Sequence, residues 1–123
     1  MKNKIQDKIL KKIKSKKINI GIVGVGYVGL NCLIQLAKKK IKMYGFDNDE
    51  IKINSLKRSV SPILYIKNKT ILDIKKYTDY EVNYKNIEKC DVIIICLPTP
   101  LDDKQRPDLS HIKNAILKIK KFL

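Results

Sequence analysis

Three glycines directly after a short β-branched run restrict the possible fold of this chain more than any other feature. Gly24, Gly26 and Gly29 fit the pattern G-x-G-x-x-G, and the run of residues 18–23 precedes them. Six-residue glycine patterns recur by chance, so the weight of this one comes from its context. A buried strand, a glycine turn and a helix that begins in that turn are typical of a dinucleotide-binding βαβ unit.

Each glycine of the motif has a separate physical task in such a unit. Gly24 permits the tight turn out of the strand, and Gly26 lets the backbone approach a pyrophosphate without an intervening Cβ atom. Gly29 allows the helix to pack closely on the strand. The amide groups of Tyr27 and Val28 are then free at the positive end of the helix dipole, which favours a phosphate.

An acidic residue stands at the expected place for recognition of a ribose. Asp47 follows the glycines by about 20 residues and ends a second apolar run, residues 41–47. A carboxylate there accepts hydrogen bonds from the ribose hydroxyls of NAD and repels the 2′-phosphate of NADP. The sequence therefore predicts NAD as the cofactor.

The rest of the pattern predicts one α/β domain, a Rossmann-type doubly wound parallel sheet in which strands alternate with helices. The expected strands are residues 18–23, 41–47, 78–82 and 91–96, and the expected helices are residues 27–40, 49–56, 70–76 and 108–123. Lysines 38–40 are expected in the last turn of their helix, and Asp108 or Ser110 is expected to cap the last helix. Residues 91–96 include three consecutive isoleucines, so we expect cover on both faces of that strand.

The high net charge does not make nucleic acid the preferred partner. The chain of 123 residues carries a net charge of +15, but arginine, the usual reader of phosphates and guanines, occurs only at Arg58 and Arg106. Abundant lysine and isoleucine indicate the coding bias of an AT-rich genome. With no signal peptide and no long apolar segment, the sequence predicts a cytoplasmic protein without a membrane partner.

Cysteine and histidine usage adds no catalytic or metal site. Cys32, Cys90 and Cys96 show no metal-ligand spacing and are interpreted as free thiols. His111, the only histidine, is expected on the surface of the last helix.

Residues 1–16 form a basic extension ahead of the domain, which we place at residues 17–123. Ile5, Ile9 and Ile13 repeat every four residues among lysines, which predicts a narrow apolar stripe on a helix. That helix could lie on the domain, on a membrane surface or in solvent, and an extra helix without function is the simplest interpretation.

Four segments of the chain resemble the UDP-glucose/GDP-mannose dehydrogenase family. They are GIVGVGYVGL at residues 21–30, GFD at 45–47, DVIIICLPTPL at 91–101 and RPDLS at 106–110. The Pro-Thr-Pro-Leu loop with the later Pro-Asp-Leu-Ser is similar to the branch that oxidises UDP-N-acetylhexosamines. Carried over by motif, the resemblance adds Lys52 and Thr99 to Tyr27, Val28 and Asp47 as NAD contacts. Lysine is so abundant here that Lys52 is equally well explained as a solvated side chain.

The resemblance also implies what this chain lacks. Family members oxidise the sugar in two successive hydride transfers, with a cysteine in a Gly-Gly-x-Cys motif and a lysine, and neither that motif nor its lysine is found in residues 1–123. None of the three cysteines is assigned to catalysis. We therefore expect the NAD-binding domain of a UDP-N-acetylhexosamine 6-dehydrogenase, inactive alone, with substrate binding and oligomer contacts in other regions. The alternative is an NAD-binding module without catalysis.

Overall fold

The computed structural model describes residues 3–123 and is built on a four-stranded sheet in which every pairing is parallel. The strands lie in the order β3-β2-β1-β4 and comprise β1 (Asn19–Val23), β2 (Lys42–Phe46), β3 (Thr78–Glu81) and β4 (Val92–Ile95). The helices are α1 (Lys4–Lys14), α2 (Tyr27–Lys38), α3 (Glu50–Lys57), α4 (Asn68–Asp73) and α5 (Ser110–Ile119), with short 3-10 turns η1 (Lys75–Tyr77), η2 (Ile87–Lys89) and η3 (Lys120–Phe122). The α/β fold is confirmed, and every expected strand and helix is present with small shifts at its ends.

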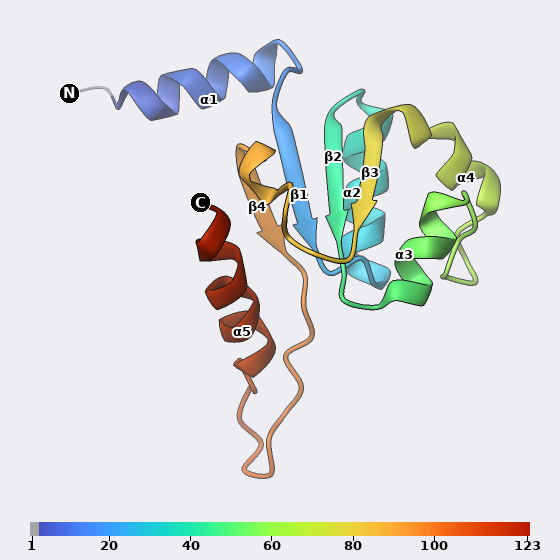
Figure 1. Ribbon diagram of the computed structural model, residues 1–123, viewed down its shortest axis with the longest axis vertical. Coiled ribbons are helices and arrows are strands. Elements are labelled where there is room, and N and C mark those ends of the chain that lie inside the picture. The colour runs from blue at the N-terminus through green and yellow to red at the C-terminus, as the bar shows by residue number, and fades with distance from the viewer. Residues whose placement is uncertain (1–2) are drawn as a thin grey trace.

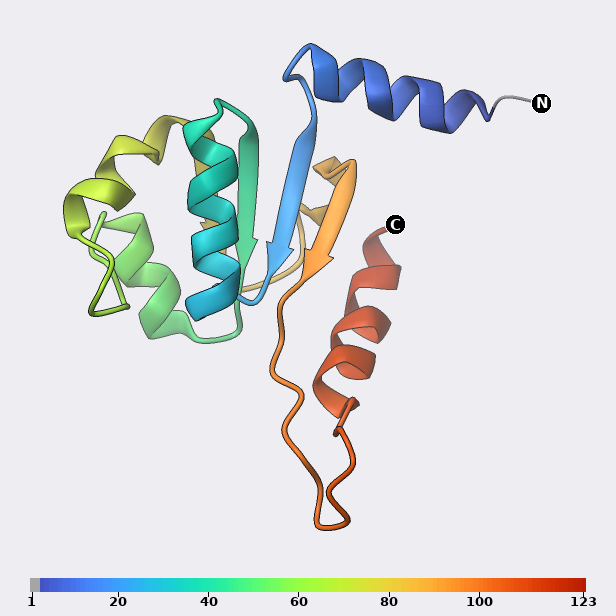
Figure 2. The same cartoon turned by 180° about the vertical axis from the view of Figure 1, so that it is seen from behind.

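Helices cover both faces of the sheet, as a doubly wound fold requires. On one face α2 and α3 pack on the strands, with α4 beside α3, and α5 lies on the other face (Figures 1 and 2). Alternate side chains of β1 divide between these layers. Ile20 and Ile22 join the cluster under α2, whereas Val23 joins a smaller cluster with Phe46 and Ala115. The core therefore lies on both sides of the central strands.

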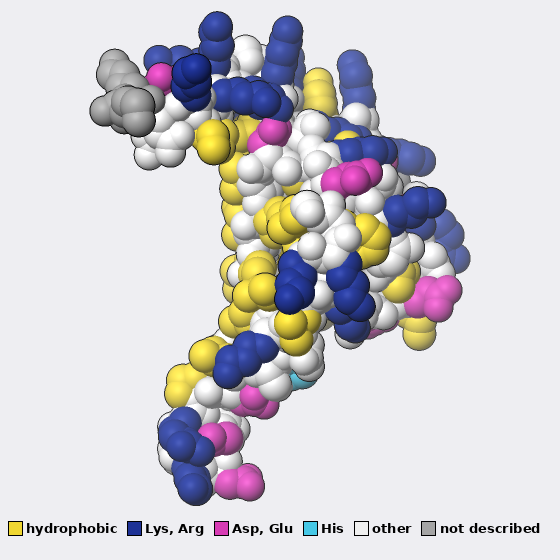
Figure 3. All heavy atoms as spheres, turned by 60° about the vertical axis from the view of Figure 1, so that its left-hand side comes forward, with side chains coloured by type: hydrophobic (Ala, Val, Ile, Leu, Met, Phe, Trp, Pro, Cys, Tyr) yellow, Lys and Arg dark blue, Asp and Glu magenta, His cyan; other side chains and the backbone are white. Residues whose placement is uncertain are grey.

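Both faces of the isoleucine-rich strand are covered as expected, but only in part. All four residues of β4 are only half-buried, although Ile93 and Ile95 contact one core cluster and Val92 and Ile94 the other. The reason is position, because β4 is an edge strand and no strand pairs with its far side within residues 3–123. Figure 3 shows apolar side chains in a band below α1 on this face.

Three helices end in the same way, on a residue with left-handed backbone. Lys16, Lys40 and Ser59 have φ angles of 57°, 65° and 59°. Each follows the last residue of its helix by two positions, and the pair of backbone hydrogen bonds of a Schellman motif closes each end. α2 therefore ends at Lys38, and only that lysine of residues 38–40 lies within the last helical turn.

The first turn of α5 corrects the expected cap. Leu109, not Asp108 or Ser110, occupies the N-cap position, and Ser110 is the first helical residue. Asp108 still contributes, because its Oδ1 accepts a hydrogen bond from the Ser110 amide at 2.9 Å. The Asp108 carboxylate thus fixes the backbone just before α5, from one position earlier than the N-cap residue.

α1 extends from the amino-terminal end of β1 and projects past β4 (Figure 1). Ile9 contacts the core under α2, and Lys12 Nζ donates to Asp91 Oδ1 just before β4. Ile5 and Ile13, the other members of the predicted stripe, are exposed. No helix in the described part of the chain has the length and apolarity needed to cross a membrane.

Candidate functional site

The glycine turn lies at the carboxyl end of β1, between the ends of β2 and β4. Gly24 has a φ of 93°, which L-residues with a side chain rarely adopt, and its amide donates to Phe46 O at 2.7 Å. A Cβ at this position would lie 2.6 Å from Cys96 O. Both the backbone conformation and the closeness of the chain after β4 therefore require glycine here.

The two other glycines of the motif differ in what surrounds them. A Cβ on Gly26 would meet nothing within 4 Å among the described residues, so the space in front of it is open. A Cβ on Gly29 would lie 1.7 Å from Gly24 O and 3.1 Å from Ile22 Cγ2. Gly29 was expected to bring the helix close to the strand, and the tightest contact is instead with the turn itself. Gly26 leaves room for a ligand, whereas Gly29 allows the turn and α2 to meet.

The start of α2 presents free backbone amide groups to this open space. Gly26 is the N-cap residue and offers no side chain to its helix, whose first backbone bond runs from Leu30 N to Gly26 O at 2.9 Å. The side chains of Tyr27 and Val28 are 66% and 68% exposed. The amide groups of this first turn have no partner within the helix, and the helix dipole adds partial positive charge there.

Asp47 connects the glycine turn to the start of α3. Its Oδ2 accepts from the Val25 amide at 3.0 Å and from Lys52 Nζ at 3.1 Å, and its Oδ1 accepts from the Asp49 amide at 3.0 Å. The side chain is 10% exposed. A carboxylate has about four acceptor positions. The three observed bonds leave acceptor capacity on Oδ1, so the residue can still take a hydroxyl donor.

Sequence reasoning missed two hydrogen-bond partners of this carboxylate and one aromatic residue that its charge affects. The sequence pattern marks Val25 only as a spacer between glycines and Asp49 only as the start of a helix, whereas Asp49 also caps α3 by accepting from Lys52 N. Tyr84, in the irregular segment after β3, packs against Phe46 with ring centroids 5.8 Å apart. Burial raises the pKa of Tyr84, and the charge of Asp47 adds to that rise. Asp47 stands two residues before Asp49, at the start of the expected helix, and this spacing could have indicated their contact. No sequence pattern indicates the position of Tyr84.

Thr99 lies on the exposed loop that leaves β4 at the same edge of the sheet. This loop starts beside the glycine turn, because the Cys96 amide donates to Val23 O at 2.7 Å and Leu97 approaches Gly24. The structure therefore brings the turn, Asp47 and Lys52 together, and places Thr99 on a neighbouring loop. Its role as a cofactor contact stays a prediction.

The environment of the thiols does not favour a nucleophile. Burial raises the pKa of Cys90 to about 11, and the nearby Asp91 and Glu81 carboxylates contribute to the rise. Burial also raises the pKa of Cys96. A thiol attacks as thiolate, so the raised pKa values disfavour the reactive form of these two side chains. Within residues 3–123 no cluster of three metal-ligating side chains occurs.

Comparison with known proteins identifies relatives of this arrangement. Residues 18–123 match the sequence model described as "UDP-glucose/GDP-mannose dehydrogenase family, NAD binding domain". The UDP-N-acetyl-D-glucosamine 6-dehydrogenase of Pseudomonas aeruginosa is 30% identical over 108 residues, which cover 88% of this chain and 25% of that protein. The UDP-N-acetyl-D-mannosamine dehydrogenase of Methanococcus vannielii is 30% identical over 120 residues, covering 89% of this chain and 27% of the relative.

Solved structures show the same fold. The UDP-N-acetyl-mannosamine dehydrogenase Cap5O from S. aureus superposes with a TM-score of 0.77 at 25% sequence identity, over 85% of this chain and 26% of that one. The chain thus spans about a quarter of the length of the relatives that it matches.

Proposed function

The chain belongs to the UDP-glucose/GDP-mannose dehydrogenase family, whose NAD-binding domain corresponds to residues 18–123, and on this basis we propose that its glycine turn, the start of α2 and Asp47 bind NAD. The observation that carries the proposal is the open space at Gly26, where a Cβ would meet nothing within 4 Å among the described residues. Chain elements pack tightly around Gly24 and Gly29 on either side of it, so this gap lies where a pyrophosphate must approach the backbone.

The proposed division of work follows from the geometry of the turn. The amides of Tyr27 and Val28, at the positive end of α2, hold the pyrophosphate. Asp47 accepts from a hydroxyl of the adenosine ribose through its remaining acceptor capacity. NAD supplies the hydride acceptor when it is bound, and this chain supplies position and charge.

Lys52 adjusts the choice between NAD and NADP. Its ammonium group lies 3.1 Å from Asp47 Oδ2, so it offsets part of the negative charge beside the ribose. The carboxylate itself offers no hydrogen-bond donor to a 2′-phosphate. Three hydrogen bonds from the chain hold the carboxylate in place. We therefore propose a preference for NAD that depends on the acid, with Lys52 as an orienting partner.

We further propose that the protein serves a nucleotide-sugar 6-dehydrogenase that acts on a UDP-N-acetylhexosamine. Two relatives at 30% identity carry names for enzymes of this substrate class. The Pro98-Thr99-Pro100-Leu101 loop is similar to that branch and leaves the sheet beside the glycine turn. Oxidation itself is assigned to the whole enzyme, since the chain spans about a quarter of these relatives.

Calorimetric titration of the 123-residue chain with NAD tests the cofactor site directly. Gly26→Val fills the open space with a side chain and is expected to abolish measurable NAD binding while the thermal unfolding temperature stays near that of the wild type. Native affinity in the Gly26→Val variant would overturn the assignment of this turn.

The same titration with NADP tests the role of the acid. Asp47→Asn should weaken NAD binding by roughly 1.5–3 kcal/mol, the range for a hydrogen bond to a charged group. It should also reduce or reverse the difference in affinity between NAD and NADP, because the Lys52 ammonium loses its ion-pair partner and becomes available to a phosphate. Equal affinity of the wild type for both cofactors would show that Asp47 does not face the ribose.

A further inference from the structure

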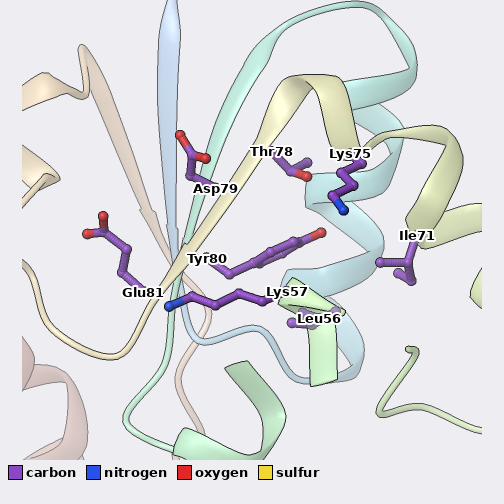
Figure 4. A pocket seen from close by; sticks show the side chains of 8 residues that line it. All are labelled: Leu56, Lys57, Ile71, Lys75, Thr78, Asp79, Tyr80 and Glu81. Carbon is purple, nitrogen blue, oxygen red and sulfur yellow. The ribbon is translucent and has the colours of Figure 1, made fainter. Parts of the chain in front are cut away.

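A crevice lies beside β3, at the edge of the sheet opposite β4, and the proposed NAD site does not use it. It has a volume of about 380 Å³, and its walls come from the end of α3, from α4 and η1, and from β3 itself (Figure 4). Leu56 and Ile71 give it an apolar side. The crevice adjoins the last turn of α3, whereas Asp49 and Lys52 at the start of that helix contact Asp47.

One polar group in this crevice is buried and has no partner. The Tyr80 side chain projects between β3 and the helices (Figure 4), and the residue is only 6% exposed. Its hydroxyl forms no hydrogen bond with any residue of the described chain. Burial raises the pKa of Tyr80, and the neighbouring Thr78 hydroxyl, which donates to Ile74 O at 3.3 Å, acts to lower it. Because buried polar groups are nearly always paired, this hydroxyl marks a place where a ligand group fits.

The charged groups on the same side of β3 are cationic. Lys57 and Lys75 line the crevice, and neither forms an ion pair within residues 3–123. Asp79 and Glu81 also border the crevice, but their carboxylates point to the other face of the strand (Figure 4), as alternation requires. There Asp79 is paired with Lys42 at 2.6 Å. Glu81 accepts from Asn86 through Oε1, while its Oε2 is buried without a partner among residues 3–123.

We propose that this crevice binds a small organic anion, a carboxylate or a phosphate monoester with an apolar body. The Tyr80 hydroxyl donates to the anion, and the Lys57 and Lys75 ammonium groups balance its charge. Leu56 and Ile71 contact the apolar body. The volume is at the lower end of the range for small-molecule sites, which suits a ligand of one ring.

Titration of the ¹⁵N-labelled chain by NMR tests the site with three probes of one shape: benzoate, phenyl phosphate and neutral benzamide. Benzoate, phenyl phosphate or both should give saturable shifts in the amides of residues 56–57, 71–75 and 78–81, and comparison of the two shows which anion the site prefers. Benzamide should bind at least about tenfold more weakly, the loss expected for a hydrogen bond to a charged group. Benzamide affinity equal to that of both anions, or shifts confined to other residues, would overturn the proposal.

Matched variants separate a built site from the general attraction of a basic protein for anions. Tyr80→Phe removes only the hydroxyl, and Lys75→Gln removes one ammonium group, so each should raise the Kd of the preferred anion about tenfold. Lys76→Gln removes the same charge from the next residue, which does not line the crevice, and should change the Kd less than twofold. Equal weakening by Lys75→Gln and Lys76→Gln would show nonspecific attraction. Tyr80→Phe should retain native NAD binding and thermal stability, so the test stands apart from that of the cofactor site.

Discussion

β1 and β4 are neighbours in the sheet and have similar apolar sequences, yet they are buried very differently. Ile22 of β1 is fully buried between two helical layers, with a parallel strand on each side. Ile94 pairs with it in register but is half-buried, like every residue of β4. β1 and β4 thus have similar sequences but different environments. The burial of an apolar strand depends on whether strands flank both of its edges as well as on its own residues.

The strongest test of this contrast is at Gly29, where the helix that covers β1 meets the glycine turn. Gly29→Val would place atoms where Gly24 O and Ile22 already lie, so we expect a loss of more than about 3 kcal/mol in the free energy of unfolding. Urea denaturation measures it, with Gly26→Val as the matched control in open space. Similar stability of the two variants would show that the packing on β1 is looser than described.

A pair of identical truncations compares the two strands directly. Ile22→Ala should cost about 3–5 kcal/mol, since it empties a fully enclosed volume. Ile94→Ala, at the paired position of β4, should cost roughly 1–2 kcal/mol because solvent already reaches the side chain. Equal losses in urea denaturation would remove the distinction between a central and an edge strand.

The smallest effect is expected at the ion pair that attaches α1 to the start of β4. Burial acts to raise the pKa of Asp91, but the Lys12 hydrogen bond, the Asn19 amide and the charges of Lys12 and Lys8 lower it below its ordinary value. A carboxyl with a lowered folded pKa stabilises the protein above its unfolded pKa, near 3.9. This contribution is lost as pH falls through the folded pKa.

Asp91→Asn should therefore reduce stability by about 0.5–1 kcal/mol at neutral pH. The gap to the wild type should close as the pH drops below about 3.9 in urea denaturation. Asp73→Asn, which breaks the exposed pair with Lys69, is the control and should change stability less. A gap that persists unchanged at acid pH would indicate that Asp91 acts through its hydrogen bonds and not through its charge.

The glycine turn and the acid beside it could be predicted from sequence because their signals are local. Gly24, Gly26 and Gly29 fix a turn between a strand and a helix, and Asp47 follows at a set distance, so neighbouring residues carry most of the information. The burial of β4 depends on strand order, which no residue of β4 encodes. Tyr84 approaches Asp47 only through the path of the chain after β3. The orphan hydroxyl of Tyr80 likewise depends on how α3, α4 and β3 meet.

The three left-handed helix ends relate the nucleotide composition of a gene to the backbone conformation of its protein. Glycine is the residue that this conformation favours, and a non-glycine residue there costs roughly 1–2 kcal/mol in conformational energy. Glycine codons begin with two guanines, whereas lysine is encoded by AAA or AAG, so an AT-rich gene drifts away from glycine at positions that tolerate the change. Lys16, Lys40 and Ser59 adopt this conformation without glycine, and the hydrogen bonds of each helix end are still formed. At Gly24 and Gly29 a side chain would overlap backbone atoms, so the same replacement of glycine is not tolerated there.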